Sequence, residues 1–386
     1  MTPLSMKSEV MTGHRRAAIV LLLLIVFLAP SGRADNYPEG VAPRVSSSRV
    51  ENPIPLMAYY YIWFDTQSWN RAKTDFPLLG RYSSDDQAVM EQHIRWAKEA
   101  GIDGFIVSWK STFKLDRRLE QLLEIADREG FYLWIIYQGL DFERRPLPVD
   151  RIDADLEFFL EHFAAHPSLH LYSQPLVIWS GTWEFSRQQV EAITSSYGEQ
   201  LLILASERNL EGYRRLADLV AGNAYYWSSV NPVTFPTYQQ KLMGMSAAVH
   251  RRGGIWLAPA APGFDARLLG GSTVVERLEG ATLQTQLDTA LRSAPDAIGL
   301  ISWNEFSENT HIEPSQRYGT QALDLLAGRE VTTPPALPDF DSSAPATTSP
   351  GAYAPLLVVG GTLLFILFSI ALALLRHRQD VDLDFP

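Results

Sequence analysis

Two glutamates near the C-terminal end of the chain have the residue type and spacing that acid–base chemistry needs. They lie in the stretch 297–314, AIGLISWNEFSENTHIEP, which begins as an apolar run and becomes rich in carboxylates. Glu305 and Glu308 are three positions apart, so their backbones lie within about 10 Å of each other even in a fully extended chain. Both carboxyl groups can therefore reach one sugar-sized ligand and act on it as acid and base. The alternative is a pair of solvated loop glutamates beside the start of a helix.

An element must hold this pair in place, and the apolar run 297–303 predicts a strand. A short apolar run between turn signals is typical of a parallel strand that is covered on both faces. In a barrel of such strands the chemistry takes place where the strands end. Glu305 and Glu308 would then follow the carboxyl end of the last strand, with Asn304 and Glu313 beside them.

From Ile54 onward, apolar runs alternate with amphipathic stretches. We expect eight strands, at 56–64, 104–109, 132–139, 175–180, 201–207, 223–228, 255–259 and 297–303. Each precedes a predicted helix, at 85–100, 116–129, 151–166, 186–197, 210–220, 238–252, 283–293 and 316–327. Such alternation calls for parallel strands with right-handed crossovers, so we predict an α/β fold, a (β/α)8 TIM barrel, over 54–328. A doubly wound sheet is the alternative, but no glycine-rich phosphate loop follows the first strand.

The strand ends supply aromatic rings and polar groups that suit a carbohydrate, because rings pack on the CH-rich faces of sugars while carboxylates and amides bond to hydroxyls. Because side chains alternate along a strand, at least one of Tyr59 to Tyr61 must face the helices, and part of the aromatic set belongs to the core. Glu207 could instead cap the helix at Asn209, and Lys110 could pair with Glu207 or remain solvated. The residues expected to bind substrate are Tyr59, Tyr61, Trp63, Asp65, Trp109, Lys110, Gln138, Glu207, Tyr226, Trp227, Asn304 and Glu313.

Composition argues against several other functions. A formal net charge of −11, without clustered lysines and arginines, argues against a nucleic-acid partner. The chain has no cysteine, which excludes disulfides, a thiolate nucleophile and cysteine–zinc sites. His162 and His166 have a possible metal-ligand spacing but lie on a predicted outer helix, and no Gly-x-Ser-x-Gly elbow is present. The sequence therefore implies no metal and no organic cofactor.

The motif around the glutamates resembles the signature of glycoside hydrolase family 99, the endo-α-mannosidase and endo-α-mannanase group. The resemblance is carried by Asn304-Glu305, by Glu308 and by the segment 310–314, THIEP. The segments 56–64, 82–85 and 262–265 also look like family motifs, so the resemblance runs along the whole predicted barrel. Phe306, Ser307 and Asn309 stand where the family has an aromatic residue, a histidine and a glycine.

The resemblance implies retaining hydrolysis of α-linked, mannose-type glycans. In this family the residue that matches Glu305 draws the proton from the 2-hydroxyl of the sugar, which attacks the anomeric carbon and gives a 1,2-anhydro intermediate. The residue that matches Glu308 serves as acid and then as base. Two alternatives remain, a cell-surface protein that binds carbohydrate without cleaving it and a glycosidase of different sugar specificity. Both are motivated by the residues at 306, 307 and 309.

The two ends of the chain predict export and a membrane anchor. Arg15-Arg16 precede an uncharged apolar run, and small residues follow it, which indicates a signal peptide at 1–34; a twin-arginine signal is the alternative. Residues 35–53 and 329–351 lack apolar periodicity and are predicted linkers. Twenty-four uncharged residues at 352–375, followed by a basic tail at 376–386, predict a transmembrane helix in the lipid bilayer, with a buried core helix as the alternative. We therefore expect a single-pass protein of the cell membrane whose barrel lies on the extracytoplasmic side.

Overall fold

The computed structural model describes residues 54–328 of the 386-residue chain. Its strands are β1 Leu56–Tyr61, β2 Gly104–Trp109, β3 Tyr132–Gln138, β4 Leu176–Ser180, β5 Leu202–Ala205, β6 Gly222–Ala224, β7 Ile255–Ala260, β8 Phe264–Asp265, β9 Val274–Val275 and β10 Ala297–Leu300. Its α-helices are α1 Gln87–Glu99, α2 Phe113–Glu129, α3 Val149–His162, α4 Arg187–Tyr197, α5 Leu210–Leu216, α6 Tyr238–His250, α7 Ala281–Arg292 and α8 Gln321–Leu326. The 3-10 helices are η1 Thr66–Asn70, η2 Pro167–Leu169, η3 Thr182–Glu184, η4 Arg267–Leu269 and η5 Leu278–Gly280.

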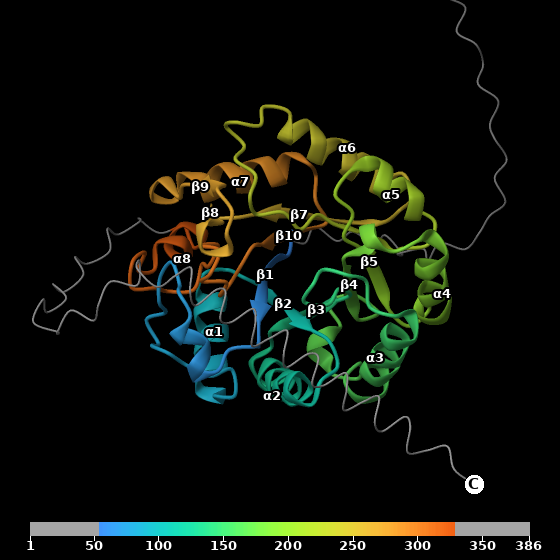
Figure 1. Ribbon diagram of the computed structural model, residues 1–386, viewed down its shortest axis with the longest axis horizontal. Coiled ribbons are helices and arrows are strands. Elements are labelled where there is room, and N and C mark those ends of the chain that lie inside the picture. The colour runs from blue at the N-terminus through green and yellow to red at the C-terminus, as the bar shows by residue number, and fades with distance from the viewer. Residues whose placement is uncertain (1–53, 329–386) are drawn as a thin grey trace, which may run out of the picture. The chain divides into compact units, whose positions relative to one another are not determined.

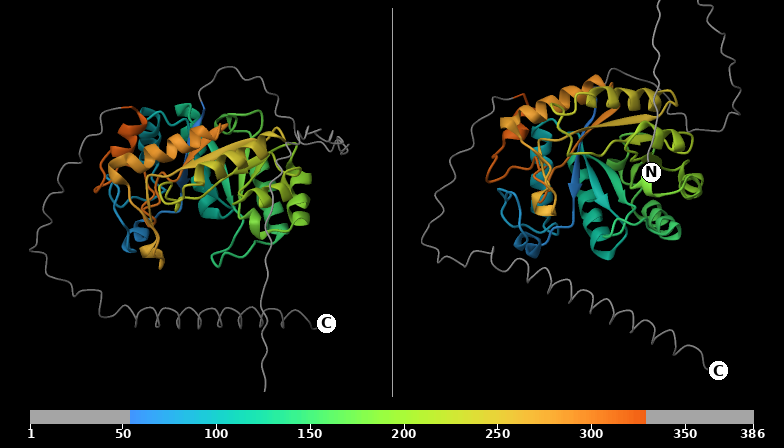
Figure 2. Two further views of the ribbon diagram at one scale, coloured as in Figure 1. Left: turned by 90° about the horizontal axis from the view of Figure 1, so that it is seen from above. Right: turned by 45° about the horizontal axis from the view of Figure 1, so that its top comes forward.

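Eight parallel strands close into a barrel in the order β1-β10-β7-β6-β5-β4-β3-β2. The first and last strands of the barrel pair with each other, with Met57 opposite Gly299. The strands gather at the centre and the helices surround them (Figure 1), and two further views show the same arrangement (Figure 2). The predicted (β/α)8 barrel is therefore confirmed.

Burial on both faces explains the apolar strands. The six residues of β2, GFIVSW, are all buried, because one face of the sheet meets the helices and the other fills the barrel. Tyr59 belongs to the interior cluster with Met57, Ile106 and Trp134. Its neighbour Tyr60 belongs to the outer cluster beneath the helices. The predicted alternation along β1 is confirmed.

Local signals set the ends of the helices. Thr112 caps α2 by accepting a hydrogen bond from the backbone of Leu115, and Gly130 ends the helix in the left-handed conformation at φ 60°. Only glycine adopts that conformation without strain, so the chain can turn at once toward β3. Each α-helix lies within a few residues of its predicted position.

The structure differs from the prediction at several strand ends and in one added element. The last barrel strand stops at Leu300, earlier than expected, because Ser302 N–H bonds to the carbonyl of Thr310 in its own loop. The short hairpin β8–β9 was not predicted, since each of its strands has only two residues and shows no periodicity.

No helix within residues 54–328 is both long and apolar enough to cross a membrane. The predicted signal peptide at 1–34, the linkers at 35–53 and 329–351, the transmembrane helix at 352–375 and the tail at 376–386 lie outside the described residues.

Candidate active site

The segment after β10 folds back on itself and presents Glu305 and Glu308 at the carboxyl end of the barrel. Ile312 N–H bonds to the carbonyl of Ser302, and Glu313 N–H bonds to that of Trp303, so the two ends of the segment are closed together. The backbone N–H of Glu305 is held by Ser302 Oγ at 2.9 Å. The loop is therefore fixed on both sides of the glutamate pair.

The two carboxyl groups have different electrostatic surroundings. Burial raises the pKa of Glu305, while a backbone hydrogen bond of 2.9 Å from Ser307 and the charge of Lys73 act in the opposite direction. Burial, and then the negative charge of Glu305, raise the pKa of Glu308 to about 7, against the opposing charge of Arg144. Neighbouring carboxyl groups in different surroundings can take different roles in acid–base catalysis.

Two tyrosines complete the group around the glutamates. The hydroxyls of Tyr61, at the end of β1, and Tyr226, after β6, are hydrogen-bonded to each other. The pKa of each is raised by burial and by the charges of both glutamates, so both phenols stay protonated. Tyr59 supports them from inside the barrel, packing edge-on against Tyr226 with 4.7 Å between ring centroids. Of the predicted site residues, the structure thus brings together Glu305, Glu308, Tyr61 and Tyr226.

A pocket of about 380 Å³ opens beside Glu305. It lies between the β1–α1 connection and the tip of the β8–β9 hairpin. The predicted residue Trp63 is on its wall, 42% exposed and stacked on Tyr61 with 4.3 Å between ring centroids. The lining residues are Trp63, Phe64, Ser68, Arg71, Ala72, Lys73, Leu268, Leu269, Glu305 and Ser307.

Asn304 and Glu313 lie beneath the site instead of in it, and this corrects the expectation that they face substrate. Asn304 is fully buried and bonds to both the N–H and the carbonyl of Tyr61, at 2.9 and 3.0 Å. Glu313 accepts a hydrogen bond of 2.8 Å from the Tyr82 hydroxyl and lies 3.0 Å from Nε2 of His93. Both side chains attach the motif to β1 and α1.

Trp109 and Glu207 are also buried, and neither lines the pocket. Trp109 is fully buried under the helices, and its Nε1 donates to Asp116 on α2 at 2.9 Å. Strand alternation is the reason, since β2 turns this ring outward. Glu207 is 2% exposed and pairs with Arg215 of α5 at 3.1 Å. The expectation that Trp109 and Glu207 line the cleft is therefore corrected.

Four other predicted residues, Asp65, Lys110, Gln138 and Trp227, lie at the same end of the barrel and contact neighbouring side chains there. Asp65 caps η1 and pairs with Lys114 at 3.6 Å, and Gln138 donates to Ser108 Oγ at 3.0 Å. Lys110 Nζ lies 4.9 Å from the ring centroid of Phe142, and Arg208 lies 5.2 Å from that of Trp227. None of the four lines the pocket, so their contact with substrate stays a prediction.

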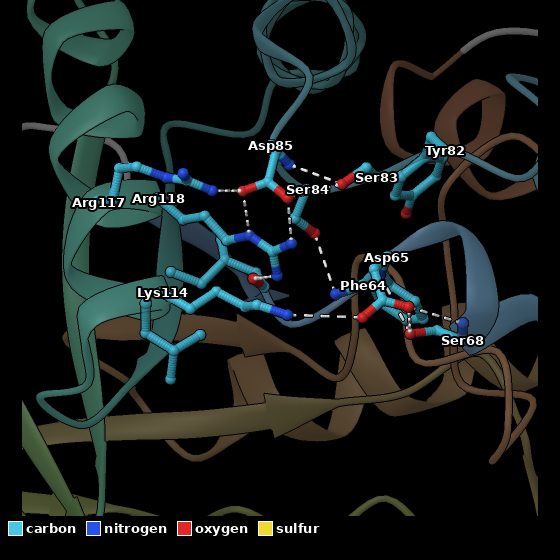
Figure 3. A network of polar contacts seen from close by, with 12 residues as sticks. Phe64, Asp65, Ser68, Tyr82, Ser83, Ser84, Asp85, Lys114, Arg117 and Arg118 are labelled. Carbon is cyan, nitrogen blue, oxygen red and sulfur yellow. Dashed lines mark hydrogen bonds and ion pairs between the residues drawn. The ribbon is translucent and has the colours of Figure 1, made fainter.

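A buried arginine, Arg118, holds the β1–α1 connection, which carries Trp63 and Asp65. Arg118 of α2 donates two hydrogen bonds to Asp85, at 2.9 and 2.6 Å, and a third to the carbonyl of Ile62 at 2.9 Å. Figure 3 shows Arg118 and Arg117 converging on Asp85, with Lys114 reaching Asp65 nearby. The hydrogen bonds to Asp85 hold the pKa of its carboxyl far below the usual range.

Sequence reasoning missed Lys73, Arg144 and Arg277. The first two act electrostatically on the glutamates, yet both lie in irregular loops where no periodicity or spacing marks them. Arg277 is buried and donates to the carbonyls of Asn309 and His311, at 3.0 and 2.6 Å. Within residues 54–328, no three histidine, aspartate or glutamate side chains form a group that could hold a metal ion.

A sequence profile of glycosyl hydrolase family 99 matches residues 65–333, which is well over half of the chain. The chain belongs to this family. As a member of glycosyl hydrolase family 99 it is a glycoside hydrolase, and the matched region includes the glutamate pair.

The chain is similar to several endo-α-mannosidases, at low sequence identity. A glycoprotein endo-α-1,2-mannosidase of Rattus norvegicus is 22% identical over 73% of this chain and 74% of its own length. The enzyme of the same name from Mus musculus is also 22% identical, over 64% of this chain and 59% of its own length. Among solved structures, a family 99 endo-α-mannosidase from Bacteroides thetaiotaomicron matches with a TM-score of 0.61 and 18% identity, covering 68% of this chain and 88% of that one. This likeness shows the barrel fold.

Proposed function

We propose that this glycoside hydrolase cleaves α-linked, mannose-type glycans with retention of configuration, using Glu305 and Glu308. The observation that carries the proposal is the pair itself: two half-buried carboxyl groups at the end of β10, one with a pKa of about 7. The substrate class is supported by the family and by the names of the rat and mouse proteins.

Glu305 suits the role of first base. Burial raises its pKa, but the Ser307 N–H and the charge of Lys73 both favour the ionised form that a base needs. Glu305 would take the proton of the sugar's 2-hydroxyl as that oxygen attacks the anomeric carbon. Glu308 would protonate the departing oxygen as the glycosidic bond breaks.

The second step reverses these proton transfers. Ionised Glu308 takes a proton from water, and the water oxygen opens the 1,2-anhydro ring at the anomeric carbon. Glu305 returns its proton to the 2-oxygen. Two inversions at one carbon give net retention, and both glutamates return to their starting protonation states.

The division of roles is tested with Glu305→Gln and Glu308→Gln. Glu308→Gln should be most damaging for substrates with poor leaving groups and partly spared for an aryl or fluoride leaving group, which needs no acid. Glu305→Gln should show no such rescue. A 2-fluoro sugar found attached to Glu305 by mass spectrometry would contradict the 2-hydroxyl route, because it would make Glu305 a direct nucleophile.

The substrate is tested with a panel of α-linked oligosaccharides that vary in sugar, linkage and chain length. We expect cleavage within α-mannose-type chains and none of β-linked controls. Exclusive cleavage of a non-mannose glycan would contradict the substrate class while leaving the roles of the glutamates in place.

We further propose that the enzyme is exported and held at the cell membrane by the segment 352–375, with the barrel outside. The support is the uncharged twenty-four-residue run and the basic residues that follow it. Protease treatment of intact cells should release the barrel into the medium. Complete protection of the barrel in cells whose other surface proteins are cleaved would contradict this topology.

A further inference from the structure

The pocket beside Glu305 has an apolar part and a cationic part. Trp63, Leu268 and Leu269 present exposed apolar surface, at 42%, 44% and 56% exposure. Arg71 and Lys73 bring two positive charges to the same space. An exposed aromatic ring next to hydrogen-bond donors can take a sugar ring and its substituents together.

Arg71 and Lys73 both line the pocket, and no carboxylate within residues 54–328 forms an ion pair with either of them. Several other cations at this end of the barrel do hold a carboxylate, as in the pairs Lys114–Asp65, Arg145–Asp141, Arg215–Glu207 and Arg267–Asp265. Lys110 and Arg208 lie against the rings of Phe142 and Trp227 instead. Glu305 is the acidic residue that lines the pocket with them. Two cations thus face one carboxylate, in a chain whose formal net charge is −11.

Lys73 is held in surroundings that favour an additional anion. It is half-buried, and burial, together with the like charge of Arg71, lowers its pKa, while Glu305 acts in the opposite direction. A partly desolvated ammonium group beside a second cation gains stability when a negatively charged group binds between them. Both side chains could donate charge-assisted hydrogen bonds to such a group, and these bonds would stabilise the bound state.

We propose that this pocket binds a negatively charged substituent, such as a phosphate, sulfate or carboxylate, on a sugar of the glycan next to the bond that is cleaved. Lys73 and Arg71 bind the anionic group, and Trp63 packs against the sugar ring that carries it. The inference rests on the proposed glycosidase function and narrows its substrates to acidic glycans.

The test is a binding measurement on the full chain by isothermal titration calorimetry. The ligands are methyl α-mannoside, its 6-phosphate and 6-sulfate, the corresponding uronate, and inorganic phosphate. We expect at least one charged sugar to bind about tenfold more tightly than the neutral one at low salt, with the difference shrinking as salt rises. Inorganic phosphate should bind more weakly than the charged sugar, because it lacks the ring that packs on Trp63. The three charged sugars together identify which anion the pocket prefers.

Lys73→Met should bring the affinities for charged and neutral sugars to within about threefold. Lys98→Met is the matched control, since Lys98 lies in the last turn of α1, at the opposite end of the barrel, and should leave the difference unchanged. If Lys73→Met melts far below the parent protein, the variant Arg71→Gln is measured instead, because Arg71 is exposed. It should also reduce the difference in affinity between charged and neutral sugars, by a smaller factor. A Lys73 that only neutralises Glu305 would change neutral and charged ligands alike, and that result overturns the proposal.

Two further results would overturn the proposal. One is equal affinity of the parent protein for neutral and charged sugars, and the other is equal affinity for inorganic phosphate and the sugar phosphate. The readout is independent of hydrolysis, so it separates the two proposals. A protein that binds charged sugars through Lys73 but cleaves no α-mannoside would contradict the proposed function alone. One that cleaves neutral α-mannosides without preferring charged sugars would contradict the pocket alone.

Discussion

Glu308 titrates near neutral pH because its carboxyl group is buried beside the charge of Glu305. In its proposed role as the acid it must be protonated, so kcat/KM should fall as pH rises through about 7. Glu305 must be ionised, so activity should also fall on the acidic side, at a pH above the ordinary glutamate range because burial raises its pKa. A bell-shaped profile of kcat/KM against pH is expected.

The control for that profile is Glu308→Gln assayed with a glycosyl fluoride, which needs no acid. The alkaline limb should be absent in this variant and the acidic limb should remain. An alkaline limb of the same pKa in the variant would assign that titration to another group.

The same titration predicts how Glu308 affects stability. Its pKa is higher in the folded than in the unfolded chain, so its contribution is fully present below the unfolded pKa and is lost as pH rises through about 7. At pH 8 a partly buried carboxylate therefore destabilises the barrel, and Glu308→Gln should raise the free energy of unfolding by roughly 1–3 kcal/mol. At pH 4.5 the two proteins should differ little. Urea denaturation at both pH values measures this, with Glu161→Gln on the exposed face of α3 as the control.

The β8–β9 hairpin lies against the loop that carries Glu305 and Glu308. Asp265 N–H bonds to the carbonyl of Glu308 at 2.7 Å. Arg277, just after β9, is stacked 4.0 Å from the Tyr318 ring centroid, and burial lowers its pKa to about 10. Its two bonds to the loop satisfy carbonyls that would otherwise be buried without a donor. We therefore expect the hairpin to position Glu308 through the backbone of its loop.

We expect Arg277→Met to lower kcat by about tenfold or more while changing KM much less, because Glu308 loses its position and not its chemistry. Arg277→Lys, which keeps a donor, should recover part of the loss. Equal losses in the two variants would contradict a positioning role, and melting curves show whether each variant remains folded.

The connection after β1 depends on the buried arginine of α2. Removing Arg118 leaves the Ile62 carbonyl without its donor, so Arg118→Met should cost roughly 2–4 kcal/mol of unfolding free energy. Arg117→Met removes an equal charge from the same carboxylate, but Arg117 is about half exposed and should cost less than about 1 kcal/mol. Urea titration of both variants checks this. Equal costs would mean that burial of Arg118 contributes nothing.

At the scale of the whole molecule, the barrel closes by pairing β1 with β10, and every described element belongs to it or packs on it. We therefore expect residues 35–328 to fold without the segments on either side. Thermal unfolding of this fragment should be a single cooperative transition. A broad transition would show that a segment beyond Gly328 or before residue 35 completes the core.

Much of the architecture could be predicted because its signals are local. The apolar run of β2 and the glycine at 130 are readable in a few residues, and the alternation of strand and helix then selects the barrel. The hairpin β8–β9 could not be predicted in this way, since two-residue strands leave no pattern. The glutamate pair follows β10 as predicted, and its role in catalysis stays a prediction. Asn304 and Glu313, close to the glutamates in sequence, turned out to support Tyr61, Tyr82 and α1.

The sequence by itself determined the fold class, the family and the position of Glu305 and Glu308 at a strand end. These depend on periodicity and on a short motif, which need no partner from elsewhere in the chain. Only the tertiary structure decided which side chains share the pocket, because Lys73 and Leu268 meet Glu305 across long stretches of sequence. It also decided that the pKa values of both glutamates are raised, since burial and the charges of Lys73 and Arg144 exist only once the barrel has closed.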